Sequence, residues 1–535
     1  MKRSLLLVTL ALAAITAACN GGGGSSVTPP PPQGNFSNAS LKGQYTFIMS
    51  GSDATVGLSL ARVGSFIADG AGNISMAIED VNSEANGNDA TVTFTGGTYS
   101  IQSNGYGTIT FAQGGVAALG LSVQLSSPAQ GLLIENDLNA SSSGSLTLVS
   151  ATVPATFALS QINGPYVFDV SGVSNNGTAD EPLSVVGQFT SNSGNIPSGT
   201  VDINDGFAAA PSGAISLTAT TYQLDPSANG TTFGRGTLTI NANGEILDFV
   251  FYLGANGILN MVSADSGVTT SGTGVQQSVA IPTTNAQFQG SFVTVIGGSV
   301  LSTSEAGPLG RAARFMADGS GNLSMIYGVQ NDDGSATQLT PTTSTSGTYA
   351  IDTTHPGSGR GSVAFVDSQG VTVDAIFYMS SATQGFFQDT SPDVIGDGSI
   401  QTQSGGPFSA SSVEGSYAFN WSGDTLISNQ NSTPFEMDVL GQFTIPTPSG
   451  QTVSGAMDIA VLGSNGNPYI QQDPVTTTLT VNGDGTDTNT YKFVTSKSPS
   501  STFNFDAFYV SPTQVYLVGI DKTLVVIGTG TVQTP

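Results

Sequence analysis

A pattern of alternating large apolar residues returns four times along this chain. The copies open at Gly43-Gln44-Tyr45-Thr46-Phe47, Gly164-Pro165-Tyr166-Val167-Phe168, Gly290-Ser291-Phe292-Val293-Thr294 and Gly415-Ser416-Tyr417-Ala418-Phe419. Successive openings are 121, 126 and 125 residues apart. Alternation with a period of two is typical of a strand that packs one face against a core. The chain is therefore predicted to hold four copies of one β-forming unit.

The second unit shows the clearest succession of strands and turns. Strand-like runs occur near 164–171, 183–191, 198–204, 216–224, 234–241, 246–254, 257–264 and 271–277, separated by Asn-Gly and Asp-Gly turns. Such a meander hides its edges completely when it closes into an up-and-down barrel. We expect an all-β protein of four tandem antiparallel, about eight-stranded barrel-like units, analogous to lipocalin-like or avidin-like barrels in strand number alone. β-Sandwich repeats and a β-propeller are the alternatives.

Further landmarks recur in each unit. A G-x-F triplet marks the second strand, and D-G-x-G-N hairpins follow it at 69–73 and 318–322. The sixth strand carries Phe251-Tyr252, Phe377-Tyr378 and Phe508-Tyr509, and an Asp is expected to end the seventh strand at Asp137, Asp265, Asp389 and Asp521. As a set, these motifs resemble those of repeat-built secreted proteins and lipoproteins of acidobacterial type, over about residues 36–533. The resemblance implies no activity, since its motifs mark turns and core positions.

The N-terminus has the features of an export signal. Lys2 and Arg3 precede an apolar run that is too short to span a membrane. The sequence Thr16-Ala17-Ala18-Cys19 resembles a lipobox, in which the cysteine is acylated; a plain secretory leader is the alternative. Cys19 is the only cysteine, so no internal disulfide can form. We expect an exported protein, lipid-anchored in the bacterial cell envelope at the outer membrane.

The expected organisation follows from these signals and from the prolines between the units. It comprises a lipoprotein signal peptide (1–19), a Gly/Ser/Pro-rich tether (20–35) and four β repeats (36–150, 151–280, 281–405 and 406–535). The formal net charge of −26 disfavours nucleic acid as a partner. The expected partners are the membrane, through the lipid, and extracellular polysaccharide or another surface protein.

Few residues stand out as candidates for chemistry. His355 is the only histidine and lies in a loop-like sequence, which disfavours a histidine-based triad or metal site. No metal site is expected, because the D-G-x-G-N hairpins fall short of the oxygen-ligand spacing of a calcium loop. The weak candidates are Asp80, Asn82 and Glu84, in a stretch of the first unit that is richer in oxygen ligands. No cofactor is expected.

Three further residues have a structural and a functional interpretation. Arg235 and Arg360 occupy equivalent positions and are expected to pair with carboxylates or cover a barrel end; the alternative is a contact with an acidic ligand. Trp421, the only tryptophan, is expected to fill a core, and the alternative is stacking on a sugar or a flat apolar ligand.

The sequence favours a non-catalytic cell-envelope lipoprotein that acts as a surface interaction or structural protein. A barrel array that binds small ligands or glycans is the alternative, and a hydrolase is a remote one. Open cavities lined by aromatic residues would favour the ligand-binding alternative, whereas filled interiors would favour the first hypothesis.

Overall fold

The structure is a computed structural model. It describes residues 35–53, 58–84, 90–137, 139–177, 179–208, 211–301, 306–332, 335–339, 347–366, 372–426, 435–446, 452–462, 469–477, 479–496 and 501–535. The expected signal peptide with Cys19, and the tether up to residue 34, lie outside the described residues.

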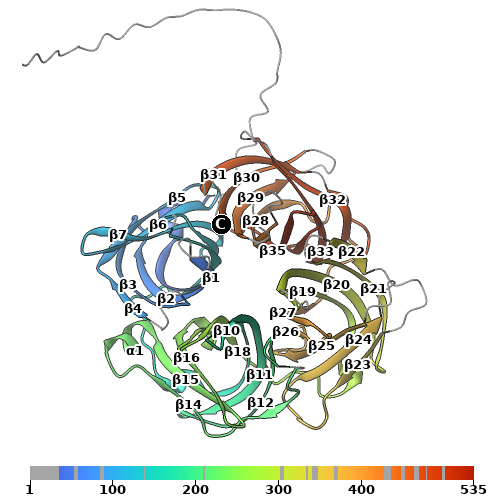
Figure 1. The fold of residues 1–535 in the computed structure, drawn as a ribbon. Coiled ribbons are helices and arrows are strands. Elements are labelled where there is room, and N and C mark those ends of the chain that lie inside the picture. Colours follow the sequence, from blue (N-terminus) through green and yellow to red (C-terminus); the bar gives the residue numbers. More distant parts are fainter. Residues whose placement is uncertain are drawn as a thin grey trace, which may run out of the picture. The chain divides into compact units, whose positions relative to one another are not determined.

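The chain folds into four antiparallel barrels, which confirms the expected fold class (Figure 1). The strands of the first barrel are β1 (Lys42–Asp53), β2 (Ser59–Asp69), β3 (Asn73–Ser83), β4 (Ala90–Phe94), β5 (Gly96–Ile101), β6 (Tyr106–Gln113), β7 (Val116–Ser127), β8 (Gln130–Glu135) and β9 (Ala140–Ser150). Strand β1 pairs with both β2 and β9, so the sheet closes on itself. Neither a sandwich nor propeller blades form, because each unit pairs its own first and last strands.

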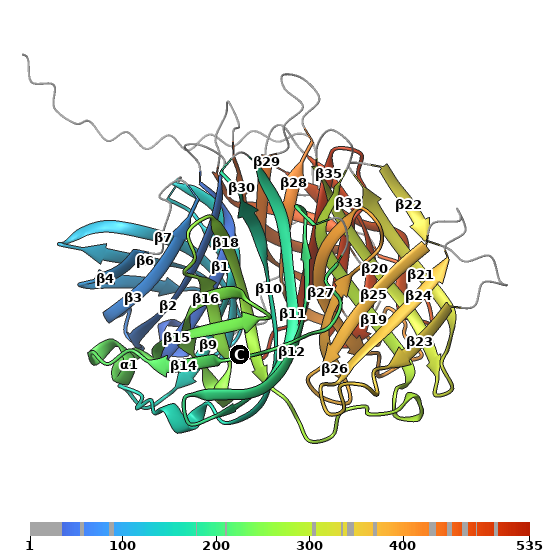
Figure 2. The same ribbon diagram turned by 60° about the horizontal axis from the view of Figure 1, so that its bottom comes forward.

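The second and third barrels repeat this order. The second contains β10 (Gly164–Asn175), β11 (Asp180–Asn192), β12 (Asn195–Asp205), β13 (Ile215–Ser216), β14 (Thr220–Leu224), β15 (Arg235–Ala242), β16 (Glu245–Leu253), β17 (Leu259–Ser263) and β18 (Val268–Gln276). The third contains β19 (Gln289–Leu301), β20 (Ala306–Asp318), β21 (Asn322–Asp332), β22 (Ser335–Leu339), β23 (Gly347–Ile351), β24 (Arg360–Val366), β25 (Thr372–Met379), β26 (Gln384–Asp389) and β27 (Val394–Thr402). Figure 2 shows β10, β11 and β12 side by side along their length.

The fourth barrel closes with eight strands. They are β28 (Gly415–Thr425), β29 (Phe435–Ile445), β30 (Val453–Val461), β31 (Tyr469–Thr477), β32 (Thr486–Thr495), β33 (Thr502–Ser511), β34 (Gln514–Gly519) and β35 (Leu524–Val532). The described helices are short: η1 (Asn38–Ser40), η2 (Leu159–Gln161), α1 (Ala228–Phe233), η3 (Ala255–Gly257) and η4 (Asn285–Gln287).

The fourth strand of the first three barrels differs from the expected continuous element. In each it is split in two, as β4 and β5, β13 and β14, and β22 and β23. In the second barrel the break falls within the expected strand at 216–224, where Ala219 adopts a positive φ of 49°. The first piece pairs with the far part of the third strand and the second piece with its beginning, so the two together fill one barrel position.

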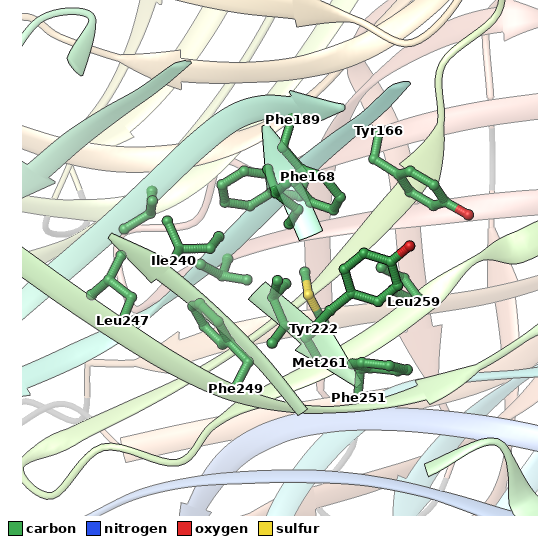
Figure 3. Packing of buried hydrophobic residues seen from close by; sticks show 14 of the residues in the cluster. Tyr166, Phe168, Phe189, Tyr222, Ile240, Leu247, Phe249, Phe251, Leu259 and Met261 are labelled. Atoms are coloured by element: carbon green, nitrogen blue, oxygen red, sulfur yellow. The ribbon is translucent and has the colours of Figure 1, made fainter. Parts of the chain in front are cut away.

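Each barrel has its own apolar core. Figure 3 shows the second, in which Tyr166, Phe168 and Phe189 from β10 and β11 lie opposite Phe249 and Phe251 from β16. The first, third and fourth barrels bury comparable sets of aromatic and aliphatic residues. The interiors are therefore separate rather than one core shared by the four units.

Two sequence landmarks are displaced from their expected positions. The carboxylates of Asp137, Asp265 and Asp521 each accept the backbone N–H that lies 17 residues earlier. In the third barrel the equivalent acceptor is the hydroxyl of Ser391, bound by the backbone N–H of Asp374 at 3.0 Å. Asp389 ends β26 two residues earlier and contacts Arg311.

The Phe-Tyr landmark of the sixth strand also changes register in the fourth barrel. Phe251 and Phe377 point into their own barrels, whereas Phe508 lies on the outside and Tyr509 inside. Because successive strand residues face opposite sides, the one-residue offset exchanges the faces of the two rings. Phe508 is thus the counterpart of Tyr252 and not of Phe251.

Candidate functional site

Asp80, on β3 of the first barrel, is bound by two side chains of the second barrel. Arg235, at the start of β15, donates from Nε to Oδ2 at 2.8 Å and from Nη2 to Oδ1 at 2.7 Å. The hydroxyl of Tyr252 donates to Oδ2 at 2.5 Å. Hydrogen bonding to Asp80 raises the pKa of Arg235 above its ordinary value. The result is a bidentate, charge-assisted contact between barrels.

The same arrangement joins the second barrel to the third. Arg360, at the start of β24, donates to both carboxylate oxygens of Asp202 at 2.8 Å, and Tyr378 donates to Oδ2 at 2.6 Å. Burial lowers the pKa of Arg360, but its hydrogen bonds and the charge of Asp202 together raise it above the ordinary value. Both predicted arginines therefore pair with a carboxylate of the preceding barrel.

An asparagine two residues after each of these aspartates makes a second contact. Asn82 donates from Nδ2 to the carbonyl oxygens of Ser263 and Val268, both at 2.7 Å. Asn204 donates in the same way to Asp389 and Val394, both at 2.9 Å. Each amide thus bridges the turn between the last two strands of the next barrel.

The third and fourth barrels use this position differently. Asn331 keeps the amide contact, donating to the carbonyl oxygens of Gly519 and Leu524 at 2.9 and 2.8 Å. Val329 replaces the aspartate and packs in an apolar cluster with Phe508 of the fourth barrel. At this position the third contact therefore has an apolar side chain in place of the aspartate, while Arg314 and Asp484 form an ion pair elsewhere in the same contact at 3.9 Å.

A fourth contact joins the last barrel to the first. Tyr106, at the position of Arg235 in its own barrel, donates to Oδ2 of Asp458 on β30 at 3.0 Å. Tyr469 of β31 also donates to this carboxylate. Asp458 is the fourth-barrel counterpart of Asp80. The contacts therefore run from first to second, second to third, third to fourth and fourth to first.

Glu84 also contacts the second barrel, where its carboxylate accepts from the Asn175 side-chain amide at 3.5 Å. It accepts a hydrogen bond from the backbone N–H of Ser59 at 3.2 Å, and burial raises its pKa. The Asp80 carboxylate faces a guanidinium, which already supplies positive charge. Within the described ranges, no group of three or more His, Cys, Asp or Glu is arranged to hold a metal ion.

Partly buried carboxyl groups gather where the fourth barrel meets the first. Asp438 on β29 is fully buried and accepts from the Ser141 hydroxyl at 2.7 Å. Asp424 and Glu436 are paired across β28 and β29 beside it. Burial, together with the neighbouring carboxylates, raises the pKa of Asp424 to about 6 and that of Glu436 well above its ordinary value. Burial also raises the pKa of Asp438 to about 6.

Trp421 is fully buried in the core of the fourth barrel. Its ring stacks on Phe419 at a centroid distance of 5.2 Å and contacts Phe505 at 4.7 Å and Phe503 at 5.8 Å. Phe503 in turn lines a cavity of about 480 Å³ at one end of this barrel. The tryptophan therefore belongs to the core, as expected, and contacts the wall of a cavity.

His355 lies in a turn before β24. Its Nδ1 is 2.8 Å from Oδ2 of Asp352, which also accepts from Arg360 at 3.1 Å. The Ser358 hydroxyl donates to the His355 carbonyl at 2.7 Å and closes the turn. These bonds connect the histidine loop to the contact between the second and third barrels.

Sequence reasoning did not pair residues from different repeats. It named Asp80 and Arg235 separately and left out Asp202, Asn204 and Asp458. A signal was present: Asp80-Val81-Asn82 and Asp202-Ile203-Asn204 occur at the same place in two units. The motif within one repeat does not indicate that the arginine it binds lies in the following repeat.

Comparisons with known proteins bear on the fold alone. No family model matches the chain, and no curated protein matches it. A protein of unknown function from the DUF3598 family of Nostoc punctiforme is 11% identical, with a TM-score of 0.16, over 45% of this chain and 96% of that one. Intact Ap-TbpB with its N and C lobes is 11% identical, with a TM-score of 0.18, over 67% and 75% of the two chains.

A variant of transferrin binding protein B from Haemophilus parasuis, a vaccine antigen, is also 11% identical. Its TM-score is 0.17, over 69% of this chain and 76% of that one. At such low identities and TM-scores, nothing about ligands or partners is carried over. Among the described residues, no helix has the length and apolar character needed to cross a membrane.

Proposed function

We propose that this chain is a non-catalytic lipoprotein of the bacterial cell envelope whose four joined barrels present an interaction surface. The proposal is based on the observation that the charged side chains singled out in the sequence join one barrel to the next. Arg235, Arg360, Asp80 and Asp202 are engaged in contacts between barrels. The cores beneath are packed with aromatic rings. A rigid body of this kind can hold its surface loops in place as a contact surface.

Binding to envelope material tests this function. The chain from Asn20 onward, folded and labelled, is mixed with peptidoglycan, outer-membrane vesicles and exopolysaccharide from cells that make the protein. We expect saturable binding to one fraction by the folded chain and none by heat-unfolded chain. Binding to no fraction overturns the interaction role. Release of new reducing ends or amino groups from the bound fraction overturns the non-catalytic one.

Lipid anchoring is tested at the N-terminus. We expect mass spectrometry of the mature protein to find acyl chains on Cys19, since several chains are needed for stable membrane attachment. The Cys19→Ser variant should leave the detergent phase for the aqueous phase, whereas Ser26→Ala in the tether should stay with the wild type. An unmodified N-terminus downstream of Cys19 contradicts the anchor.

A further inference from the structure

The cavity in the fourth barrel opens at one end of the closed sheet. Its wall is formed by the last residues of β28 and β30, which end at Thr425 and Val461. The first residues of β29, β31, β33 and β35 complete the wall. In an antiparallel barrel these strand ends all lie on one side. The cavity is therefore the mouth of the barrel and not a gap between barrels.

The size and lining of the cavity suit a small molecule. Its volume of about 480 Å³ falls within the range of ligand pockets, roughly 300–1,000 Å³. The walls are mostly apolar, and Thr and Ser side chains stand near the exposed edge. The apolar side chains include Met437, Ile459, Ile470, Phe503 and Leu524. A largely apolar molecule would be buried there with hydroxyl groups near its outer end.

An aromatic group lies behind the wall. Trp421 contacts Phe503 and occupies the position held by Met49, Val170 and Ile296 in the other barrels. Its indole N–H is buried and has no hydrogen-bond partner among the described residues, so an acceptor atom within reach would stabilise it. The largest side chain at this position thus occurs in the barrel that has this cavity.

The ionisable side chain in the cavity lining is acidic, which disfavours an anion there. Asp521 is the ionisable side chain in the lining, and its carboxylate accepts from the backbone N–H and the side-chain amide of Asn504 at 2.7 and 2.6 Å. The chain as a whole carries a formal net charge of −26. A carboxylate or phosphate entering the mouth would meet this negative field.

We propose that the mouth of the fourth barrel binds one uncharged, largely apolar small molecule beside the Trp421 cluster. This site is additional to the proposed envelope surface. A neutral alcohol or aromatic compound fits it better than a fatty acid of the same length.

The single tryptophan provides a readout specific to this barrel. The probe is N-phenyl-1-naphthylamine, a neutral apolar dye that accepts excitation energy from tryptophan. Titrated into the chain from Asn20 onward, it should quench Trp421 saturably at one dye per chain. No transfer from Trp421 up to the solubility limit of the dye overturns the proposal.

Variants of the cavity wall locate the site. Ile470→Asp places a charge on an apolar wall and should weaken dye binding by at least about tenfold. Val461→Phe fills space and should also weaken binding, which covers the case in which Ile470→Asp does not fold. Ile246→Asp, at an exposed position of the second barrel, is the matched control and should bind as the wild type does. Wild-type binding by both wall variants overturns the site.

Competition tests the class of ligand. Decanol should displace the dye at concentrations about tenfold or more below those of decanoate, because the anion must leave water for an apolar wall near a carboxylate. Equal displacement by the two compounds overturns the preference for uncharged molecules. Failure to bind envelope material would leave this result untouched, so the two proposals fail separately.

Discussion

At the scale of single residues, the repeated glycine of the second strand leaves space for a phenylalanine ring on the first strand. Gly187 pairs with Phe168 across β10 and β11, and a Cβ at Gly187 would lie 2.7 Å from the Phe168 ring and 2.8 Å from the Thr200 carbonyl oxygen. Phe47 with Gly64, and Phe419 with Gly441, repeat the arrangement. In the third barrel Thr294 replaces the phenylalanine, and Ala313 replaces the glycine. Glycine on the second strand thus accompanies phenylalanine on the first strand, because a larger residue would overlap the ring.

This pairing predicts an energetic coupling. Gly187→Ala should destabilise the second barrel by about 1–3 kcal/mol through overpacking, and Phe168→Thr should do so by about 3 kcal/mol through a cavity. The double variant copies the third barrel, so its cost should fall below the sum by at least about 1 kcal/mol. Native-state hydrogen exchange of β10 and β11 measures each cost.

A matched control distinguishes packing from a general effect of alanine. Gly483→Ala adds a methyl group where nothing lies within 4 Å, and it should change stability by less than about 0.5 kcal/mol. Strict additivity of Gly187→Ala and Phe168→Thr would show that the ring does not set the need for glycine.

At the scale of elements, strands were predictable and contacts between barrels were not. The period-two pattern and the Asn-Gly turns placed the second barrel's strands close to their observed bounds, because each signal lies within a hairpin. The register of Phe508 and the role of Ser391 were missed, since both depend on which face a residue takes after a small local shift. The side-chain contact between Asp80 on β3 and Arg235 on β15 spans 155 residues, and no local pattern encodes it.

Removing one partner of such a pair should loosen two barrels at once. Asp202→Ala leaves Arg360 with Asp352 and deprives the Tyr378 hydroxyl of its acceptor. Because the largely buried Arg360 loses its bidentate partner and keeps one contact, with Asp352, we expect a loss of about 3 kcal/mol in the protection of β12, β24 and β25 from hydrogen exchange. Glu245→Ala, at an exposed hairpin position, should leave these strands protected.

Replacing both charges checks the cause. The double variant Asp202→Leu with Arg360→Met removes the arginine along with its bidentate partner and should regain most of the lost protection, since apolar side chains can substitute for a buried ion pair. If the single and double variants lose equal protection, the ion pair is not what holds β12 to β24.

At the scale of the whole molecule, two contacts carry carboxyl groups that should respond to pH. Between the second and third barrels, burial raises the pKa of Asp397 to about 6, and burial together with the charge of Asp397 raises the pKa of Asp169 well above its ordinary value. Asp424, Glu436 and Asp438 form the second group, and the neighbours that shift their pKa values are one another and serine hydroxyls. No guanidinium contributes to these shifts, in contrast to the pair of Asp202 and Arg360.

The sign of the pH dependence follows from these shifts. Folded pKa values above the unfolded value of about 4 mean that the folded state binds more protons, so the free energy of unfolding falls as pH rises from about 4 through about 6. We expect a higher melting temperature at pH 5 than at pH 8. The triple variant Asp424→Asn, Glu436→Gln and Asp438→Asn should flatten this dependence. A melting temperature that rises from pH 5 to pH 8 would contradict it.

The contact between the fourth and first barrels differs from the others because no linker joins the two directly. Gln277 and Gln403 follow the last strands of the second and third barrels and donate to two carbonyl oxygens of the next barrel. Gln533 makes the same contact with the first barrel, donating to Asn104 and Leu125 at 2.8 and 2.7 Å. A linker between consecutive barrels keeps Gln277 and Gln403 at high effective concentration near their partners. No linker joins the fourth barrel directly to the first, so Gln533 has no such help.

Loss of this glutamine should therefore matter more than loss of its counterparts. Each variant removes two hydrogen bonds, about 1–2 kcal/mol in all. Gln533→Ala should speed hydrogen exchange in β6 and β7 more than Gln277→Ala speeds it in β24 and β25, and it should raise the radius of gyration in solution. Equal effects of the two variants would mean that the fourth contact needs no such closure and that the cores alone fix the arrangement of barrels.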